Sequence, residues 1–138
     1  MRAVRAAARV FVYGTEDEER VVRALLDVLG RANDSEARGK LTRSKIKGHF
    51  GTEILLYEGV AKSPKELRRV FDRLRAAPGL VETLRAQFEA RLDDDRVLHF
   101  RLGKQEAVEG TLVLGTGGDA IQVHVKYAEH AGGAAGFP

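Results

Sequence analysis

Three cationic side chains alternate with other residue types over a short stretch of the chain. Arg43, Lys45 and Lys47 are spaced two residues apart, so in a β-strand all three point to one side. Cations in that arrangement can follow a phosphate backbone at little conformational cost. A lysine-rich edge strand is also a common defence against edge-to-edge aggregation. The spacing predicts a phosphate-binding strand, with Lys40 near its start, and leaves the protective role as the alternative.

A glycine-bracketed segment, Gly48-His49-Phe50-Gly51, follows these cations. Glycine lets a backbone approach a phosphate closely, and an imidazole or phenyl ring can stack on an unpaired base. The same glycines would also serve a structural turn that needs positive φ, with Phe50 folded into the core. We predict a turn that places His49 or Phe50 against a base, with the purely structural turn as the alternative.

A second group of basic residues lies in the C-terminal third of the chain. His99 and Arg101 alternate with apolar residues, and so do His124 and Lys126, so each pair is expected on the outward face of a strand. If the two strands are neighbours, a second cationic patch results; an ordinary solvated face is the alternative. The predicted nucleic-acid contacts are Lys40, Arg43, Lys45, Lys47, Gly48, His49, Phe50, Gly51, Arg101, Lys104, Gln105 and Lys126.

Residue types suited to catalysis or metal binding form no recognisable motif. The chain has no cysteine, and its four histidines are not paired at zinc-enzyme spacing. The run Asp93-Asp94-Asp95 lacks further ligands for a divalent cation and predicts a solvated loop. The segment Gly115–Asp119 lacks a Walker lysine and precedes a strand, so it predicts a turn. The sequence predicts no catalytic residue, no metal and no cofactor.

The composition fits a soluble globular protein. The 138 residues suffice for one domain, and they are 43% hydrophobic and 31% charged. The formal net charge is +3, and the positive charge is concentrated in residues 31–51, which hold six basic and two acidic side chains. Without cysteine, a signal peptide or a long uncharged apolar run, the chain is expected in the cytoplasm and away from membranes.

Hydrophobic periodicity predicts alternating strands and helices in the first half of the chain. A strand ending at Tyr13 precedes a helix that starts with a capping box over Thr15–Glu18 and carries an apolar stripe over Val21–Leu29. A strand near residues 40–47, the glycine-bracketed turn and a strand over residues 53–61 are expected to form a hairpin.

Hydrophobic periodicity in the second half of the chain also predicts strands and helices. Tight turns between successive strands favour an antiparallel sheet, and helices with a single apolar stripe must cover one face of it. The predicted fold is an α+β two-layer sandwich, with residues 1–127 as one domain and residues 128–138 as a flexible tail. The remaining expected elements are a helix capped by Ser63, a third helix over 80–92, a strand over 97–102, and a terminal hairpin formed by 112–114 and 120–127.

Three stretches resemble a known family: residues 10–21 (VFVYGTEDEERV), 48–62 (GHFGTEILLYEGVAK) and 104–110 (KQEAVEG). They are similar to an archaeal RNA-binding protein family that was first catalogued as a domain of unknown function and described as a predicted exosome-associated subunit. The likeness spans nearly the whole chain in the right order. It implies a fold similar to the ribosomal protein that binds 5S rRNA, with rRNA or another structured RNA as partner. Exosome or ribosomal proteins and a second copy of the chain are further partners that it implies.

The resulting hypothesis is a non-enzymatic RNA-binding protein. The main rival is an adaptor or homodimeric module of an RNA-processing or ribosomal assembly that makes no RNA contact, which predicts a contiguous apolar patch. A small-molecule enzyme would instead need a deep pocket that gathers His49, His99 or His124 with a carboxylate. The deciding observation is whether the cations of residues 40–51 share one accessible surface or are neutralised by the acidic helices.

Overall fold

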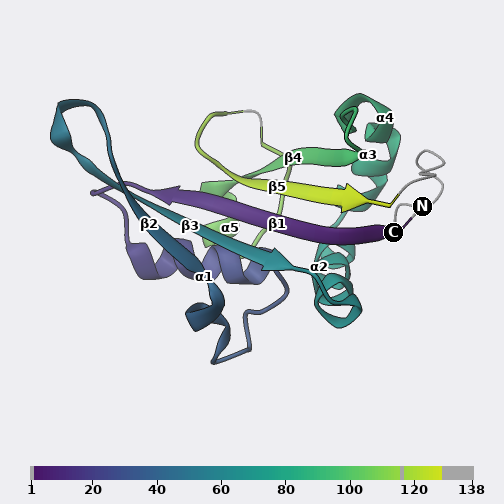
Figure 1. Cartoon of the computed structure of the whole chain (residues 1–138), viewed down its shortest axis with the longest axis horizontal. Helices are drawn as coiled ribbons and strands as arrows, with labels where there is room; N and C mark the ends of the chain where they lie inside the picture. Colours follow the sequence, from purple (N-terminus) through teal and green to yellow (C-terminus); the bar gives the residue numbers. More distant parts are fainter. Residues whose placement is uncertain (1, 116, 129–138) are drawn as a thin grey trace.

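A computed structural model of the chain describes residues 2–115 and 117–128. Five strands form one antiparallel sheet in the order β2-β3-β1-β5-β4 (Figure 1). The tail expected at residues 128–138 lies outside the described residues except for Ala128. In chain order the elements are β1 (Ala3–Val12), α1 (Glu18–Val28), η1 (Ala37–Lys40), β2 (Thr42–Lys47), η2 (His49–Gly51), β3 (Glu53–Ala61), α2 (Pro64–Ala76), α3 (Leu80–Ala86), α4 (Phe88–Arg91), β4 (Val97–Gly103), α5 (Lys104–Val108) and β5 (Ala120–Tyr127).

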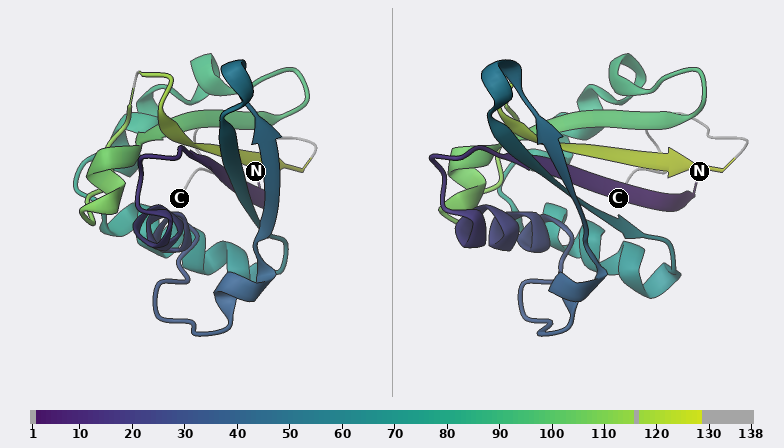
Figure 2. Two further views of the ribbon diagram at one scale, coloured as in Figure 1. Left: turned by 90° about the vertical axis from the view of Figure 1, so that its left-hand side faces the viewer. Right: turned by 60° about the vertical axis from the view of Figure 1, so that its left-hand side comes forward.

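One face of the sheet is buried and the other is open. On the central strand β1, Arg9 and Phe11 are half-buried and alternate with fully buried neighbours, which is the period of two expected for a strand with one covered face. Figures 1 and 2 show α1 and α2 on the same side of the sheet, against its covered face. The predicted α+β two-layer sandwich is confirmed. The buried residues of β1 are Ala6, Ala8, Val10 and Val12.

The start of α1 differs from the predicted capping box. Asp17 is the N-cap, and its carboxylate accepts a hydrogen bond of 3.3 Å from the backbone N–H of Arg20. Glu16 instead accepts a hydrogen bond from the backbone N–H of Tyr13, and Thr15 lies outside the helix. The predicted box is wrong because an aspartate closer to the apolar stripe is an equally good cap. The stripe itself is buried as predicted.

Gly30 closes the C-terminal end of α1. Its φ of +69° is left-handed, and the N–H groups of Gly30 and Arg31 donate to the carbonyl oxygens of Asp27 and Leu26, as in a glycine-terminated helix. A Cβ atom at Gly30 would lie 2.4 Å from the backbone carbonyl oxygen of Arg69 on α2. The close approach of α1 to α2 therefore requires glycine here.

Gly30→Ala is expected to lower the free energy of unfolding by about 2 kcal/mol, because an L residue is strained at this φ and its Cβ meets rigid backbone. Urea denaturation followed by circular dichroism measures the change. Gly39→Ala is the matched control, since no heavy atom lies within 4 Å of a Cβ built at Gly39. Equal effects of the two substitutions would contradict this account.

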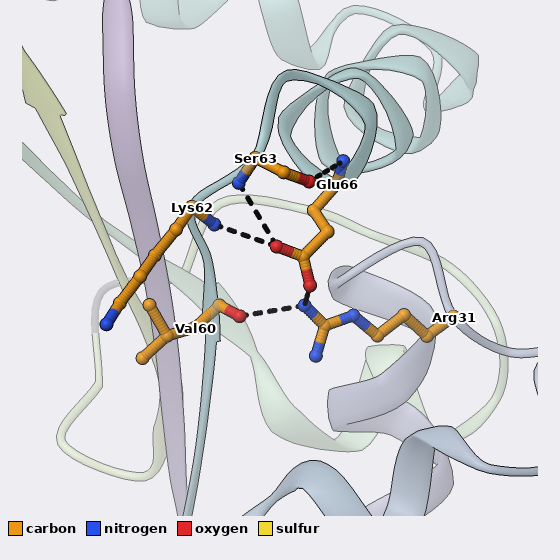
Figure 3. Close-up of polar contacts among 5 residues, drawn as sticks. All are labelled: Arg31, Val60, Lys62, Ser63 and Glu66. Carbon is orange, nitrogen blue, oxygen red and sulfur yellow. Dashed lines mark hydrogen bonds and ion pairs between the residues drawn. The ribbon is translucent and has the colours of Figure 1, made fainter.

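A buried arginine ties the end of α1 to β3 and α2 (Figure 3). The Arg31 side chain is 5% exposed and donates to the carbonyl oxygen of Val60 at 2.7 Å and to Glu66 Oε2 at 3.0 Å. Glu66 Oε1 accepts from the backbone N–H groups of Ser63 and Lys62, and Ser63 Oγ accepts from the N–H of Glu66. The hydrogen bonds from Ser63 and Lys62, assisted by the Arg31 charge, lower the pKa of Glu66. The capping box predicted at Ser63 is confirmed.

The C-terminal strand takes a different partner from the one predicted. β5 pairs with β1 on one side and β4 on the other, so the terminal hairpin of residues 112–114 and 120–127 is wrong. Residues 112–114 contribute only an isolated bridge between Leu114 and Leu102. In the interior of the sheet Ile121, Val123 and Val125 are completely buried or nearly so, and burial of this apolar side favours the central position. The outward residues of β1, β5 and β4 therefore lie side by side.

The third predicted helix is divided in two. Gln87 has φ of −102° and ψ of 9°, which ends α3 and precedes α4. The break lets Phe88 turn inward, where its ring packs edge-on against Tyr127 with the centroids 5.5 Å apart. In the described part of the chain, no helix is long and apolar enough to cross a membrane.

Candidate nucleic-acid interface

The register of the β2–β3 hairpin fixes the side on which the predicted basic strand presents its cations. Arg43 pairs with Tyr57, Lys45 with Leu55, and Lys47 with Glu53. Paired residues of antiparallel strands share a face, and Tyr57 is buried in the core cluster with α1. All three cations therefore lie on the helix side of the sheet.

Arg43 is engaged with the acidic start of α1. Its Nε donates to the Tyr57 hydroxyl at 3.0 Å and lies 3.4 Å from Glu18 Oε2. The Tyr57 hydroxyl in turn donates a short hydrogen bond to Glu18. That hydrogen bond and the charge of Arg43 lower the pKa of Glu18. Burial raises the pKa of Tyr57, and the hydrogen bond to Glu18 raises it further. Arg43 thus anchors the hairpin to α1 through its Nε; its side chain remains 45% exposed, and its predicted phosphate contact stays a prediction.

Lys45 and Lys47 differ from Arg43 in having no partner among the described residues. Both side chains are exposed, and within residues 2–115 and 117–128 neither makes an ion pair or a hydrogen bond. Lys45 borders an open cavity of about 300 Å³ whose wall includes Glu16, Glu18 and Glu53. Lys47 is the last residue of β2 and adjoins the turn. Two of the three predicted strand cations therefore present charge to solvent.

The turn between β2 and β3 displays an aromatic ring in solvent. Phe50 is 105% exposed, and its φ of 64° is unusual for a residue with a side chain. The turn is closed by the Gly48 N–H, which donates to the Thr52 carbonyl oxygen at 2.6 Å, and by the Thr52 hydroxyl, which donates to the His49 carbonyl oxygen. Gly51 also has positive φ, at 77°. The alternative in which Phe50 folds into the core is wrong.

Two predicted contacts lie away from this turn. Lys40 is exposed at the end of η1 rather than in β2, and β2 separates it from the turn by roughly 17 Å at the usual rise of a strand. Gln105 is exposed on α5, which packs against α1 in the helix layer. Figure 1 shows η1 and the β2–β3 turn at opposite ends of the hairpin. Neither residue belongs to the turn that carries Phe50.

Lys104 is a buried structural residue, so its predicted contact with RNA is wrong. Its side chain is 0% exposed. The ammonium group donates to the Phe11 carbonyl oxygen at 2.9 Å and to Glu16 Oε1 at 2.8 Å, and it lies 2.7 Å from Asp119 Oδ1. The Tyr13 ring is 4.8 Å from the same nitrogen, which is cation–π distance. All of its donor capacity is used inside the fold.

A second basic surface lies on the open face of the sheet. β4 and β5 are neighbours, as the predicted cationic patch requires. The central strand adds Arg5 and Arg9, which were not predicted because the alanines between them give no contrast between the two faces of the strand. The period-two spacing of these arginines was the available signal. We define the open-face patch as Arg5, Arg9, His99, Arg101, His124 and Lys126.

The acidic loop before β4 organises its own backbone. Asp93 accepts hydrogen bonds from the N–H groups of Asp95 and Val97, and its Oδ2 lies 2.7 Å from His99 Nε2. The contact with His99 is the main cause of the lowered pKa of Asp93. Among the described residues, no three histidine or carboxylate side chains are placed to hold a metal ion. Asp93, Asp94 and Asp95 are exposed and lie outside any helix or strand, as predicted for a solvated loop.

Comparison with known proteins gives consistent matches over nearly the whole chain. A family model described as RNA binding matches residues 5–127. An RNA-binding protein of Pyrococcus abyssi is 28% identical over 123 residues, which are 86% of this chain and 77% of that protein. A solved DUF54 structure from Archaeoglobus fulgidus has a TM-score of 0.78 at 26% identity, covering 96% of this chain and 92% of its own. A DUF54 protein from Methanothermobacter thermautotrophicus has a TM-score of 0.70 at 28% identity, covering 90% and 84% respectively.

Proposed function

This chain belongs to the RNA-binding family whose model spans residues 5–127, and from that premise we propose that it binds structured RNA through the tip of the β2–β3 hairpin. The main support is the Phe50 ring, which is 105% exposed in the turn that follows Lys47. An apolar ring held in water forgoes about 2–3 kcal/mol of burial free energy. Stacking of an unpaired base on the ring would recover part of that free energy. The proposed role is non-enzymatic and cytoplasmic.

Lys45 and Lys47 would contact RNA phosphates, and the turn would contact bases. Lys45 and Lys47 neutralise phosphates, which gives affinity without sequence preference. His49 and Phe50, whose ring centroids are 6.3 Å apart, offer two surfaces to bases, and RNA presents unpaired bases mainly in loops and bulges. The flanking glycines allow a close approach of the backbone. We propose the loop of a structured RNA, such as a ribosomal RNA, as the ligand.

The proposed contact set is narrower than the sequence alone indicates. Arg43 is assigned to holding the hairpin against α1, because its Nε contacts Tyr57 and Glu18 and the charge of Glu18 offsets its own. Lys40 and Gln105 are left out because Lys40 lies in η1 and Gln105 in α5, outside the turn that carries Phe50.

The double variant Lys45→Ala/Lys47→Ala is expected to flatten the dependence of RNA affinity on salt. Loss of two phosphate contacts should reduce the slope of log K against log salt by about 1.5. Fluorescence anisotropy with a labelled RNA hairpin, read at salt concentrations between roughly 50 and 200 mM, measures the slope.

Lys65→Ala/Arg68→Ala is the matched control, because it removes the same charge from exposed positions of α2. The control should keep the slope of the unmodified protein. An unchanged slope in the hairpin variant would remove Lys45 and Lys47 from the proposed interface.

An apolar strip on the open face favours a second candidate function, docking to a protein. Ile46 pairs with Ile54 on the hairpin, and Leu56 pairs with Phe11 on β1; Ile46 is 39% exposed. Such a strip suits an adaptor that joins exosome or ribosomal proteins, or a second copy of the chain. Protein docking would be insensitive to salt and to loss of Lys45 and Lys47, so the same measurements separate the two functions.

A further inference from the structure

The open-face patch gathers its basic side chains on three adjacent strands. Cross-strand pairing sets Arg5 beside Lys126 and His99 beside His124. Arg9 Nε donates to the side-chain oxygen of Gln122 at 2.9 Å. The described helices cover the other face, so the patch lies on the exposed side of the sheet (Figure 2).

Positive charge exceeds negative charge on this face. Arg5 and Arg101 are exposed and form no ion pair or hydrogen bond with any residue that the structure describes. Lys126 donates a short hydrogen bond to the backbone carbonyl of Asp95, which leaves its charge uncompensated. Of the described acids, Glu58 pairs across strands with Arg9, and Asp93 contacts His99. A surface with this excess attracts an anionic partner.

The open-face patch is separate from the hairpin tip. Its side chains project from the face opposite to that of Lys45 and Lys47, because the register places those lysines on the side of Tyr57. The apolar strip that begins with Phe11 and Leu56 borders the patch on the same face. RNA held at the patch would therefore use phosphates other than those that contact the hairpin lysines.

Two histidines lie at the centre of the patch. The rings of His99 and His124 are 4.5 Å apart between centroids and are tilted by 65°. Burial is the largest cause of the lowered pKa of His124, and the charges of His99 and Arg9 lower it further. The charges of Asp93 and Glu58 oppose this effect only in part. The charged or titratable groups that face His124 are His99 and Arg101 on β4, Arg5 and Arg9 on β1, Lys126 on β5, Glu58 on β3, and Asp93 in the loop before β4.

We propose that the open-face patch is a second RNA-phosphate surface, and that His124 takes up a proton when RNA binds there. In the free protein, burial and then the basic neighbours disfavour the charged form of the ring. A phosphate beside it reverses that balance and favours the imidazolium form. RNA affinity therefore rises as pH falls through the histidine range. This inference rests on the proposed function and assigns it an additional surface.

RNA affinity measured from about pH 8 to about pH 6 at fixed salt tests the proton linkage. The unmodified protein should bind more tightly at lower pH, by at most about tenfold per pH unit for one proton. His99→Asn/His124→Asn should lose this dependence. Lys65→Ala/Arg68→Ala, at exposed positions of α2 outside both proposed surfaces, should keep it and serves as the control.

Two further measurements test the second RNA surface even if His99→Asn/His124→Asn folds poorly. Arg5→Ala/Arg101→Ala, at exposed positions, should lower affinity and reduce the salt slope by about 1.5. Histidine resonances followed by NMR should show that RNA raises the pKa of His124. If Lys45→Ala/Lys47→Ala weakens binding while both of these readouts stay unchanged, only the second surface is overturned. If the unmodified protein binds no RNA at all, the proposed function itself fails.

Discussion

Lys104→Met is expected to lower the free energy of unfolding by about 3–5 kcal/mol, the usual cost of removing one partner from a buried ion pair. The ammonium group is completely buried and satisfies the Phe11 carbonyl oxygen, Glu16 and Asp119. Methionine fills a similar volume but offers no hydrogen bond. Glu16, whose side chain is 17% exposed, would be left as an unpaired charge. Urea denaturation followed by circular dichroism measures the loss.

A control substitution distinguishes loss of the buried ion pair of Lys104 from the loss of a lysine in general. Lys45→Met is the matched control, because Lys45 is exposed, and it should change stability by less than about 0.5 kcal/mol. Adding Glu16→Gln to Lys104→Met should recover part of the loss, since the orphaned carboxylate is removed. If Lys104→Met is as stable as Lys45→Met, the network around Lys104 does not stabilise the fold.

Local patterns predicted those elements whose determinants lie within a few residues of one another. The α2 cap combines Ser63, Pro64 and Glu66, and the strand over residues 53–61 was predicted with its observed bounds. The pairing of β5 could not be predicted in this way, because one partner, β1, lies at the other end of the chain and the other, β4, is separated from β5 by α5. The apolar alternation of residues 120–127 identifies a strand without naming its neighbours.

In the candidate site too, local patterns predict some features and miss those that depend on distant residues. Alternation placed His99 and Arg101 on one face because a period of two is a local property. The burial of Lys104 depends on Glu16 and on Asp119, which no local pattern connects to it. A count of basic residues therefore overstates the charge available to RNA, since some cations hold the fold together.

Phe50→Ala is expected to weaken RNA binding by up to about 3 kcal/mol, or roughly 150-fold, if one base stacks on the ring. The ring is 105% exposed and contributes nothing to the core, so the free energy of unfolding should change by less than about 0.5 kcal/mol. Fluorescence anisotropy with the labelled RNA hairpin gives the affinity, and thermal denaturation gives the stability.

Two further substitutions at Phe50 distinguish stacking from the shape of the turn. Phe50→Trp retains an aromatic face and should bind RNA at least as tightly as the unmodified protein. Phe50→Gly relieves the left-handed φ of 64°, so it should bind as weakly as Phe50→Ala while folding at least as stably. If Phe50→Ala retains full affinity while Lys45→Ala/Lys47→Ala loses it, the hairpin supplies charge alone and no base stacks on the turn. The exposed ring would then be better explained by the adaptor function, because a protein partner can bury Phe50 together with the neighbouring apolar strip.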